Sequence, residues 1–168
     1  MTDIKVRPYT KSDLARIVEL AKELDRELAA RVGRKPKPDV SERFYRGKYL
    51  DPKGYYTVLV AVAANSLDGY IIGSSSTGRP EIGMYGPQEP SRASSTEINI
   101  VFTTADSRQR GFGKAMVKSL ADYVRENYRH REIGGFVAKW NEPSAALFRS
   151  LGFDEEVQDT RSWFSQKL

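Results

Sequence analysis

The sequence predicts a single α+β domain, because stretches with helical spacing of apolar residues are interspersed with short strand-like runs. Apolar residues recur at helical intervals between Leu14 and Leu28 and form one stripe. Tyr56–Ala63 is an apolar run typical of a buried strand. Neither an internal repeat nor a domain-breaking linker interrupts this pattern, so we expect one domain over residues 1–168.

Capping and breaking residues set the limits of the expected elements. Thr10 or Ser12 can cap the first helix, and the prolines within 34–38 prevent a helix there. Residues 65–69 have the composition of a turn, and the Ser-, Gly- and Pro-rich segment 74–95 predicts an extended hairpin or a mobile loop near a site. In chain order, we expect a strand at 4–7, helices at 14–32 and 40–50, strands at 56–63 and from 70 onward, a strand at 97–103, a helix ending at 127, a strand at 133–138, a helix at 144–151, and strands at 153–157 and 160–164.

Composition and charge favour a globular protein that binds anions. Hydrophobic residues make up 39% and charged residues 29% of the chain, and no apolar run approaches the roughly 20 residues needed to span a bilayer. The charged N-terminus does not resemble a signal peptide, so we expect a cytoplasmic location. The net charge of +5 favours nucleic acid, membrane phosphates or a phosphorylated cofactor. The basic residues are dispersed without a nucleic-acid-binding motif, and we expect neither nucleic acid nor a membrane as partner.

Cysteine and histidine usage narrows the chemistry further. The chain has no cysteine, which excludes disulfides, thiolate nucleophiles and cysteine-ligated metals. Its one histidine, His130, cannot supply a histidine metal cluster, so we expect no metal cofactor. His130 stands between Arg129 and Arg131, whose charges disfavour its protonation, and this setting predicts a solvated loop position.

The segment between the strand at 97–103 and the following helix is the most suggestive of ligand binding. It consists of Arg108, Gln109, Arg110, Gly111, Phe112, Gly113 and Lys114. Glycines at an opening helix N-terminus let a pyrophosphate approach free backbone N–H groups, and the basic side chains add positive charge. An ordinary tight strand-to-helix turn fits the two glycines equally well. The segment lacks the third glycine of a dinucleotide fingerprint and the Gly-Lys-Ser/Thr ending of a nucleotide-triphosphate loop.

Three segments in the right order resemble the GNAT acetyltransferase superfamily. Arg108-x-x-Gly111-x-Gly113 matches the family's Gln/Arg-x-x-Gly-x-Gly/Ala signature, which binds the pyrophosphate of acetyl-CoA. Residues 141–153 are similar to the family's Asn-x-x-Ala-x-x-Leu-Tyr-x-x-x-Gly-Phe segment, and residues 6–14 look like its opening strand and helix cap. The resemblance implies an α/β/α-layered GNAT fold with a mixed, mostly antiparallel sheet of six to seven strands and about four helices. This sheet would splay between 97–103 and 133–138 to admit the cofactor.

The same resemblance implies which residues hold acetyl-CoA. Val101, Phe102 and Thr103 would flank the pantetheine, and a backbone N–H near Phe102 or Thr103 would polarise the thioester carbonyl. Residues 108–114 would wrap the pyrophosphate, and Asn141 would hold the pantetheine amide.

The implied activity is transfer of the acetyl group of acetyl-CoA to a primary amine of a small molecule or protein, by direct attack in a ternary complex. Glu97 would act as general base, because a protonated amine cannot attack a thioester, although an ordinary surface role has equal weight. The alternative function is an acyl-CoA-binding sensor or regulatory module with little or no catalysis. Family members dimerise in several ways, so a homodimer is among the expected assemblies.

The sequence departs from the family pattern at Phe148, where many members carry the tyrosine that protonates the leaving thiolate. Phenylalanine has no proton to donate, so a water or another tyrosine, Tyr85 or Tyr123, would take this role. Phe148 itself is expected in the core. A further implication of the resemblance is that the aromatic residues after the first helix, Phe44, Tyr45 and Tyr49, touch the acceptor.

Overall fold

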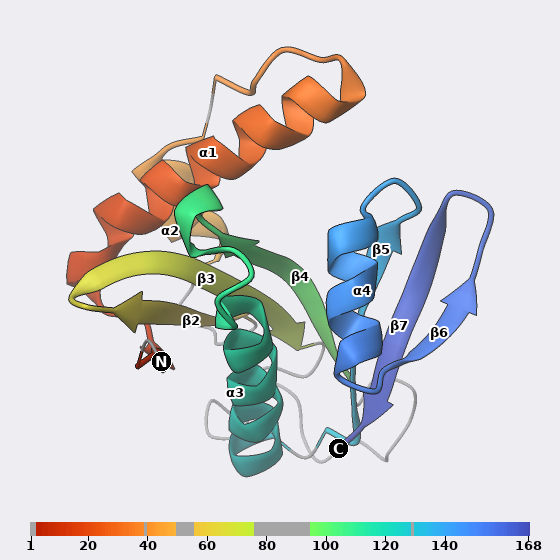
Figure 1. The fold of residues 1–168 in the computed structure, drawn as a ribbon. Coiled ribbons are helices and arrows are strands. Elements are labelled where there is room, and N and C mark those ends of the chain that lie inside the picture. Colours follow the sequence, from red (N-terminus) through yellow and green to blue (C-terminus); the bar gives the residue numbers. More distant parts are fainter. Residues whose placement is uncertain (1–2, 39, 50–55, 76–94, 129) are drawn as a thin grey trace.

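A seven-stranded sheet with helices on both faces forms the centre of the structure (Figure 1). The structure is a computed structural model, and it describes residues 3–38, 40–49, 56–75, 95–128 and 130–168. The strands are β1 (Lys5–Pro8), β2 (Tyr56–Ala63), β3 (Ser66–Ser75), β4 (Ser95–Thr103), β5 (Glu132–Ala138), β6 (Asp154–Val157) and β7 (Arg161–Lys167), in the spatial order β1-β2-β3-β4-β5-β7-β6. The helices are α1 (Leu14–Val32), α2 (Glu42–Lys48), α3 (Phe112–Asn127) and α4 (Glu142–Ser150). Neighbouring strands are antiparallel except for β4 and β5, and the expected mixed, layered α+β fold is confirmed.

Several elements end at residues other than those expected. The second helix is shorter than 40–50, and the turn expected at 65–69 is also shorter. Ala64 and Asn65, with φ of 48° and 67°, reverse the chain, and Ser66 already pairs with Ala63. The prediction was wrong for 66–69 because a two-residue hairpin connection lets the returning strand pair at once. Residues 76–94 of the expected hairpin or loop lie outside the described residues.

Two apolar layers hold the helices to the sheet. The layer beneath α1 and α2 includes Leu14, Ile17, Val18, Leu20, Ala21, Tyr45, Val58, Val60, Tyr70, Ile72 and Phe102. The layer on the other face lies beneath α3 and α4 and includes Phe112, Met116, Leu120, Val124, Ile133, Val137, Phe148, Phe153 and Phe164. The helical stripe that the sequence showed from Leu14 onward is therefore the buried face of α1.

The sheet divides between β4 and β5. These strands pair through three residues only, Ser95–Glu97 with 132–134, and Glu97 with Gly134 is the last pair. Beyond it β5 continues alongside β7, while β4 continues alongside β3. A register shift between β3 and β4 at Ile72/Gly73 adds one residue to β4 just after the last pair. The two strands diverge in Figure 1, as the expected splay requires.

His130 is buried rather than solvated. Its side chain is 7% exposed, its Nδ1 lies 2.7 Å from Oγ1 of Thr96, and its ring stacks on Tyr128 at 5.0 Å between centroids. The solvated position predicted from the flanking arginines was wrong, because residue 130, two residues before β5, turns its ring inward against Thr96 of β4 and Tyr128. Burial lowers the pKa of His130, since desolvation disfavours the charged imidazolium.

A buried carboxylate fixes the N-terminus of the sheet to α1. Asp13 accepts hydrogen bonds from both terminal nitrogens of Arg7 at 2.7 and 2.9 Å, and from the backbone N–H and hydroxyl of Thr10 at 2.6 and 2.8 Å. These bonds, that from Arg7 first, lower the pKa of Asp13 from 3.8 to about 2. Thr10 thus caps the 3-10 turn Lys11–Asp13 that leads into α1, whereas Asp13 itself precedes the first residue of α1. The ion pair with Arg7 was not predicted from the sequence.

We predict that Asp13→Asn lowers the free energy of unfolding by about 1–2 kcal/mol at pH 7, as measured by urea denaturation. The folded-state pKa is depressed, so the stabilisation is present above the unfolded-state value near 3.8 and is lost as the pH falls towards about 2. The difference from wild type should therefore narrow below about pH 4. Asp122→Asn, which breaks the exposed pair with Arg125, is the control and should have little effect at any pH. An equal loss in both variants would contradict the prediction.

Candidate functional site

The turn before α3 opens the helix N-terminus into solvent-accessible space. Gly111 precedes the helix with φ of +93°, and Gln109 also has a positive φ of 60°. The first intrahelical bond runs from Ala115 N–H to the Gly111 carbonyl at 2.9 Å, which leaves the N–H groups of residues 112–114 without a helical partner. These groups and the helix dipole favour an anion at this point. A glycine suits position 111 because other side chains rarely adopt this φ.

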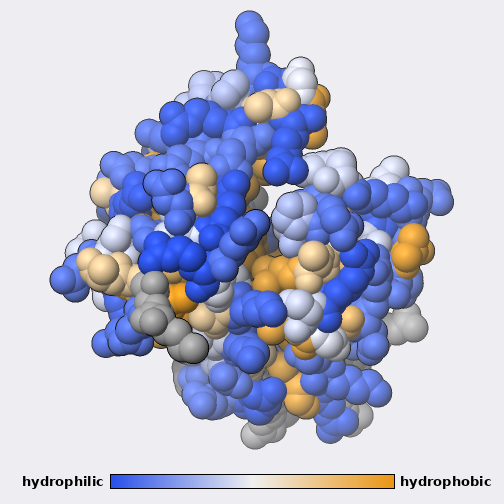
Figure 2. Space-filling model, viewed as in Figure 1, coloured by the Kyte–Doolittle hydropathy of each residue, from blue (hydrophilic) through white to orange (hydrophobic). Residues whose placement is uncertain are grey.

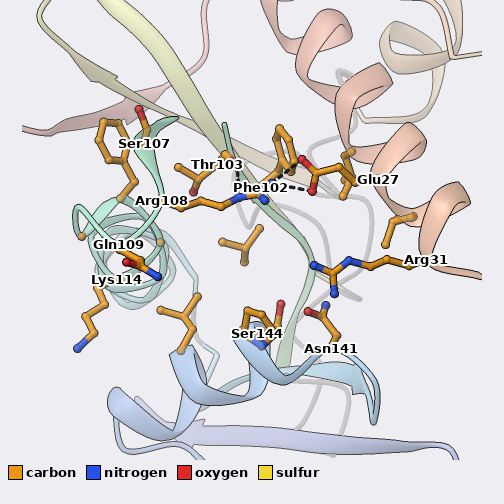
Figure 3. Close-up of a pocket in the computed structure, with 18 of the residues that line it drawn as sticks. Glu27, Arg31, Phe102, Thr103, Ser107, Arg108, Gln109, Lys114, Asn141 and Ser144 are labelled. Carbon is orange, nitrogen blue, oxygen red and sulfur yellow. Dashed lines mark hydrogen bonds and ion pairs between the residues drawn. The ribbon is translucent and has the colours of Figure 1, made fainter. Parts of the chain in front are cut away.

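A cavity of about 610 Å³ lies in front of this turn. Its walls come from the C-terminal half of α1, the end of β4, the turn and start of α3, and the start of α4 (Figure 3). The lining residues are Leu24, Glu27, Leu28, Arg31, Val101, Phe102, Thr103, Ser107, Arg108, Gln109, Gly111, Phe112, Gly113, Lys114, Trp140, Asn141, Pro143, Ser144 and Leu147. Figure 2 shows the hollow with apolar atoms at its centre and hydrophilic residues around it. An elongated ligand with an anionic end and an apolar arm matches this division.

The structure brings nearly all of the expected cofactor residues to this one cavity. The cavity is lined by Asn141 and by every residue predicted in 101–103 and 108–114 except Arg110. The guanidinium of Arg110 instead lies 6.0 Å from the centre of the Phe112 ring. Gly113 permits the close approach of α3 to α4, since a Cβ there would lie 3.1 Å from a methyl carbon of Leu147.

The α1 wall of the cavity was missed by sequence reasoning. Leu24 and Leu28 belong to the apolar stripe predicted between Leu14 and Leu28, and no role was predicted for Glu27 or Arg31. No motif marks them, because their position depends on how α1 crosses the end of β4. Their spacing of three and four residues places all four on one side of the helix. This pattern indicates a cavity wall only once the crossing of α1 over β4 is known.

An ion pair crosses the cavity from the turn to α1. The Arg108 Nη2 donates to both carboxylate oxygens of Glu27 at 2.6 Å, and Nε donates to the Thr103 carbonyl at 3.2 Å (Figure 3). The Arg108 side chain is 41% exposed and that of Glu27 is 37% exposed, so solvent screens the pair considerably. Glu27 is the one carboxylate among the described lining residues, and Arg31 and Lys114 are further cations.

Glu97 lies outside this cavity, at the point where β4 and β5 part. It is half-buried, and its side chain points to the face of the sheet covered by α1 and α2, because it pairs with Ser74, whose strand neighbour Ile72 packs there. Within the part of the chain that the structure describes, the carboxylate of Glu97 makes no hydrogen bond or ion pair. Its partly exposed side chain therefore stands at the point where the two strands part.

No tyrosine lines the cavity among the described residues. Phe148 is buried as expected and packs on Phe164 and Phe153, with ring centroids 5.5 and 5.0 Å away. Tyr123 packs partly buried against the α3 layer, 6.4 Å from the Tyr128 ring. Tyr85, the other tyrosine considered as proton donor, lies outside the described residues.

The aromatic residues of α2 pack on the opposite face from α3. Tyr45 is buried, and its hydroxyl lies 3.2 Å from that of Tyr70, so its role is mainly structural. Burial raises the pKa of both phenols. Phe44 is 40% exposed, and Tyr49 contacts Tyr56 edge-to-face at 5.1 Å between centroids. Phe44 and Tyr49 thus retain exposed ring surface on the face that carries Glu97.

Two classes of site have no counterpart in the described residues. They contain no cluster of three or more histidine, aspartate or glutamate side chains arranged to hold a metal ion. Of the helices that the structure describes, none is long and apolar enough to cross a membrane.

Comparisons with known proteins place this arrangement in a family. The model of the acetyltransferase (GNAT) domain matches residues 3–154. An acetyltransferase from Thermus thermophilus is 19% identical, with 98% of this chain and 97% of the other covered and a TM-score of 0.71. Spermidine N-acetyltransferase from Vibrio cholerae, solved with CoA and spermine, is 17% identical, with 98% and 95% covered and a TM-score of 0.70. Arabidopsis thaliana NAA60, solved with acetyl-CoA, is 16% identical, with 99% of both chains covered and a TM-score of 0.68.

A search of curated protein sequences finds no match to this chain. The structural similarities, all below one-fifth identity, establish the shared fold, and the family match rests on the model over residues 3–154.

Proposed function

The chain belongs to the GNAT acetyltransferase family, and on that premise we propose that it transfers the acetyl group of acetyl-CoA to a primary amine of a small molecule or protein by direct attack. One observation carries the proposal: the glycine turn of α3 and the division between β4 and β5 open onto one cavity. The turn suits the pyrophosphate of acetyl-CoA, and the division suits its extended pantetheine arm. The two halves of acetyl-CoA therefore have complementary surfaces next to each other in one cavity. The spermidine acetyltransferase and NAA60 structures, which were solved with CoA and acetyl-CoA respectively, support the same choice of co-substrate.

The residues of the turn fit the charged half of acetyl-CoA. Backbone N–H groups at the start of α3 and the side chains of Arg108 and Lys114 would hold the pyrophosphate. Gly111 and Gly113 keep β-carbons out of its path. Arg31 adds charge from α1, and the net charge of +5 suits a polyanionic ligand.

The free edge of β4 fits the pantetheine arm. Beyond Glu97 no strand pairs with β4 on its β5 side in the described structure, so its main-chain groups are available to amides of the arm. Val101, Phe102 and Thr103 line the cavity along this edge, and Asn141 lies opposite at the start of α4. Acetyl-CoA bound there would supply an activated acetyl thioester, and a backbone N–H near Phe102 or Thr103 would stabilise negative charge on its carbonyl oxygen.

Glu97 is proposed as the general base. An ammonium must lose a proton before its nitrogen lone pair can attack the thioester carbonyl carbon, and Glu97 would accept that proton directly or through a water. A C–N bond then forms, and the C–S bond breaks as the electron pair leaves with sulfur. A thiol has a pKa near about 8.5, so the thiolate leaves readily and takes a proton from solvent without a tyrosine at position 148. No acyl-enzyme on sulfur can form, because the chain has no cysteine.

The first experiment is isothermal titration calorimetry with acetyl-CoA on the wild type and on Gly111→Glu. Wild type should bind with a micromolar dissociation constant, and the variant should lose binding because a carboxylate replaces an open approach to the turn. Gly152→Glu is the matched control: Gly152 also has a positive φ, of 78°, with open space around it, but lies outside the cavity lining. The proposal fails if the wild type does not bind acetyl-CoA. Binding without turnover on a broad amine panel would favour the sensor function instead.

We predict that Glu97→Gln lowers kcat/KM for any accepted amine by about 10²-fold to 10³-fold at pH 7 and leaves the dissociation constant of acetyl-CoA unchanged. The loss should shrink as the pH rises and the free amine becomes abundant, which steady-state kinetics between about pH 7 and 10 would measure. Glu126→Gln, an exposed substitution on α3, is the control. A pH-independent loss would show that Glu97 acts structurally and not as a base.

We predict that Glu27→Gln tightens acetyl-CoA binding by about two- to fivefold at low salt, by calorimetry. The substitution removes a negative charge from the cavity and releases the Arg108 Nη2 for the pyrophosphate. Glu19→Gln breaks an exposed pair with Arg16 on the same helix and should leave the affinity unchanged. Weaker binding of Glu27→Gln would show instead that the ion pair orients Arg108 for the cofactor.

A further inference from the structure

Glu97 belongs to a row of residues that runs across the sheet on one face. Cross-strand pairing joins Tyr56 to Ser74, Ser74 to Glu97, Glu97 to Gly134, and Gly134 to Ser165. Paired residues project to the same side of a sheet, so this row shares the face that α1 and α2 cover over β2, β3 and β4. The row therefore continues past Glu97 onto β5 and β7.

An indole fills the place next to Glu97. Gly134 has no side chain, and a Cβ built there would lie 2.5 Å from Cζ2 and 2.9 Å from Cη2 of Trp163. The six-membered ring of Trp163 thus lies over the backbone of Gly134, on the strand beside Glu97. Trp163 is half-buried, which leaves part of its ring surface accessible.

Neighbouring side chains hold this indole in place. Phe136, which pairs with Trp163, lies 4.7 Å from it between ring centroids, and the Arg161 guanidinium covers the Phe136 ring at 3.7 Å. Phe136 is 40% exposed although it lies on a sheet face. Among the described residues, the apolar layer beneath α1 and α2 contains no residue of β5, β6 or β7, so no described helix covers these rings.

On the other side of Glu97, the row begins with another aromatic pair. Tyr56 carries the edge-to-face contact with Tyr49, and both are half-buried. The proposed base therefore lies between aromatic side chains on this face: Tyr56 begins the row on β2, and the ring of Trp163 from β7 lies over Gly134. Only Ser74 and Gly134 stand between Glu97 and these rings. An ammonium at Glu97 is attracted to the carboxylate and also to the faces of aromatic rings.

We propose that Trp163 is a specificity-determining residue, and that the acceptor is a primary amine carried on a small aromatic or apolar body, which lies on the Trp163 and Phe136 rings while its nitrogen meets Glu97. This inference rests on the proposed function, because Glu97 is its anchor. Burial against the ring surface stabilises binding of a flat apolar body, whereas a polyamine or an aminoglycoside presents little apolar area to bury. The nitrogen at Glu97 lies where β4 and β5 part, so the body extends away from the division and leaves the acetyl-CoA cavity clear.

The chain offers two tryptophans, which report on the two sites separately. Trp140 lines the acetyl-CoA cavity, and Trp163 lies beside Glu97. In Trp140→Phe the emission of Trp163 should change saturably on titration with 2-phenylethylamine and little with n-propylamine. In Trp163→Phe the emission of Trp140 should respond to acetyl-CoA and not to 2-phenylethylamine. An amine response that survives loss of Trp163 and is absent from Trp140→Phe would overturn the proposal.

Kinetics provide the second arm of the test. Trp163→Ala should raise KM for 2-phenylethylamine about tenfold while changing KM for n-propylamine less than about twofold, and Trp163→Phe should restore most of the loss. Val157→Ala is the control, because Val157 is an exposed apolar residue of β6 on the other face. Equal effects on both amines, or a change of oligomeric state in sedimentation by Trp163→Ala, would overturn the proposal. Absence of acetyl-CoA binding by the wild type would instead refute the proposed function itself.

Discussion

The brevity of the contact between β4 and β5 is the constraint on which the rest of the structure depends. Three residue pairs join the two strands, after which each follows a different neighbour. This arrangement leaves one strand edge without a partner inside the described part of the molecule, although such edges normally cost stability or invite aggregation. The edge is tolerated because helices α1, α3 and α4 surround the opening and turn it into a cavity. The same division places Glu97 where β4 and β5 part, with its side chain on the face of the sheet that α1 and α2 cover.

The two sides of the site have opposite electrostatic character. On the α3 side, backbone N–H groups and several cations create a positive wall suited to phosphate oxygens. On the Glu97 side, a carboxylate without a described partner and several aromatic rings suit a cation. Glu27 is an exception, since it brings a negative charge into the positive wall and pairs with Arg108. The proposed reaction between polyanionic acetyl-CoA and an amine would use this opposition of charges across one gap.

The sequence predicted most elements because their signals are local. The stripe from Leu14 onward and the glycine turn at 111 each depend on residues within one or two turns of helix. The residues that were missed depend on long-range packing instead. Glu27 reaches the site because α1 crosses the end of β4, and Trp163 lies over Gly134, the partner of Glu97, because β7 pairs with β5. His130 was misplaced for the same reason, since its flanking charges describe only the local chain, whereas its burial depends on packing against Thr96 and Tyr128.

A second glycine of β5 has a consequence for the width of the opening. A Cβ at Gly135 would lie 2.9 Å from the carbonyl oxygen of Ile98, immediately beyond the last pair of β4 and β5. A larger residue at 135 would act as a spacer between the two strands, whereas glycine lets them remain close up to the point of divergence. The spacing of β4 and β5 beside Glu97 is thus set by two backbones in van der Waals contact, a dimension that changes in helices or loops elsewhere leave untouched.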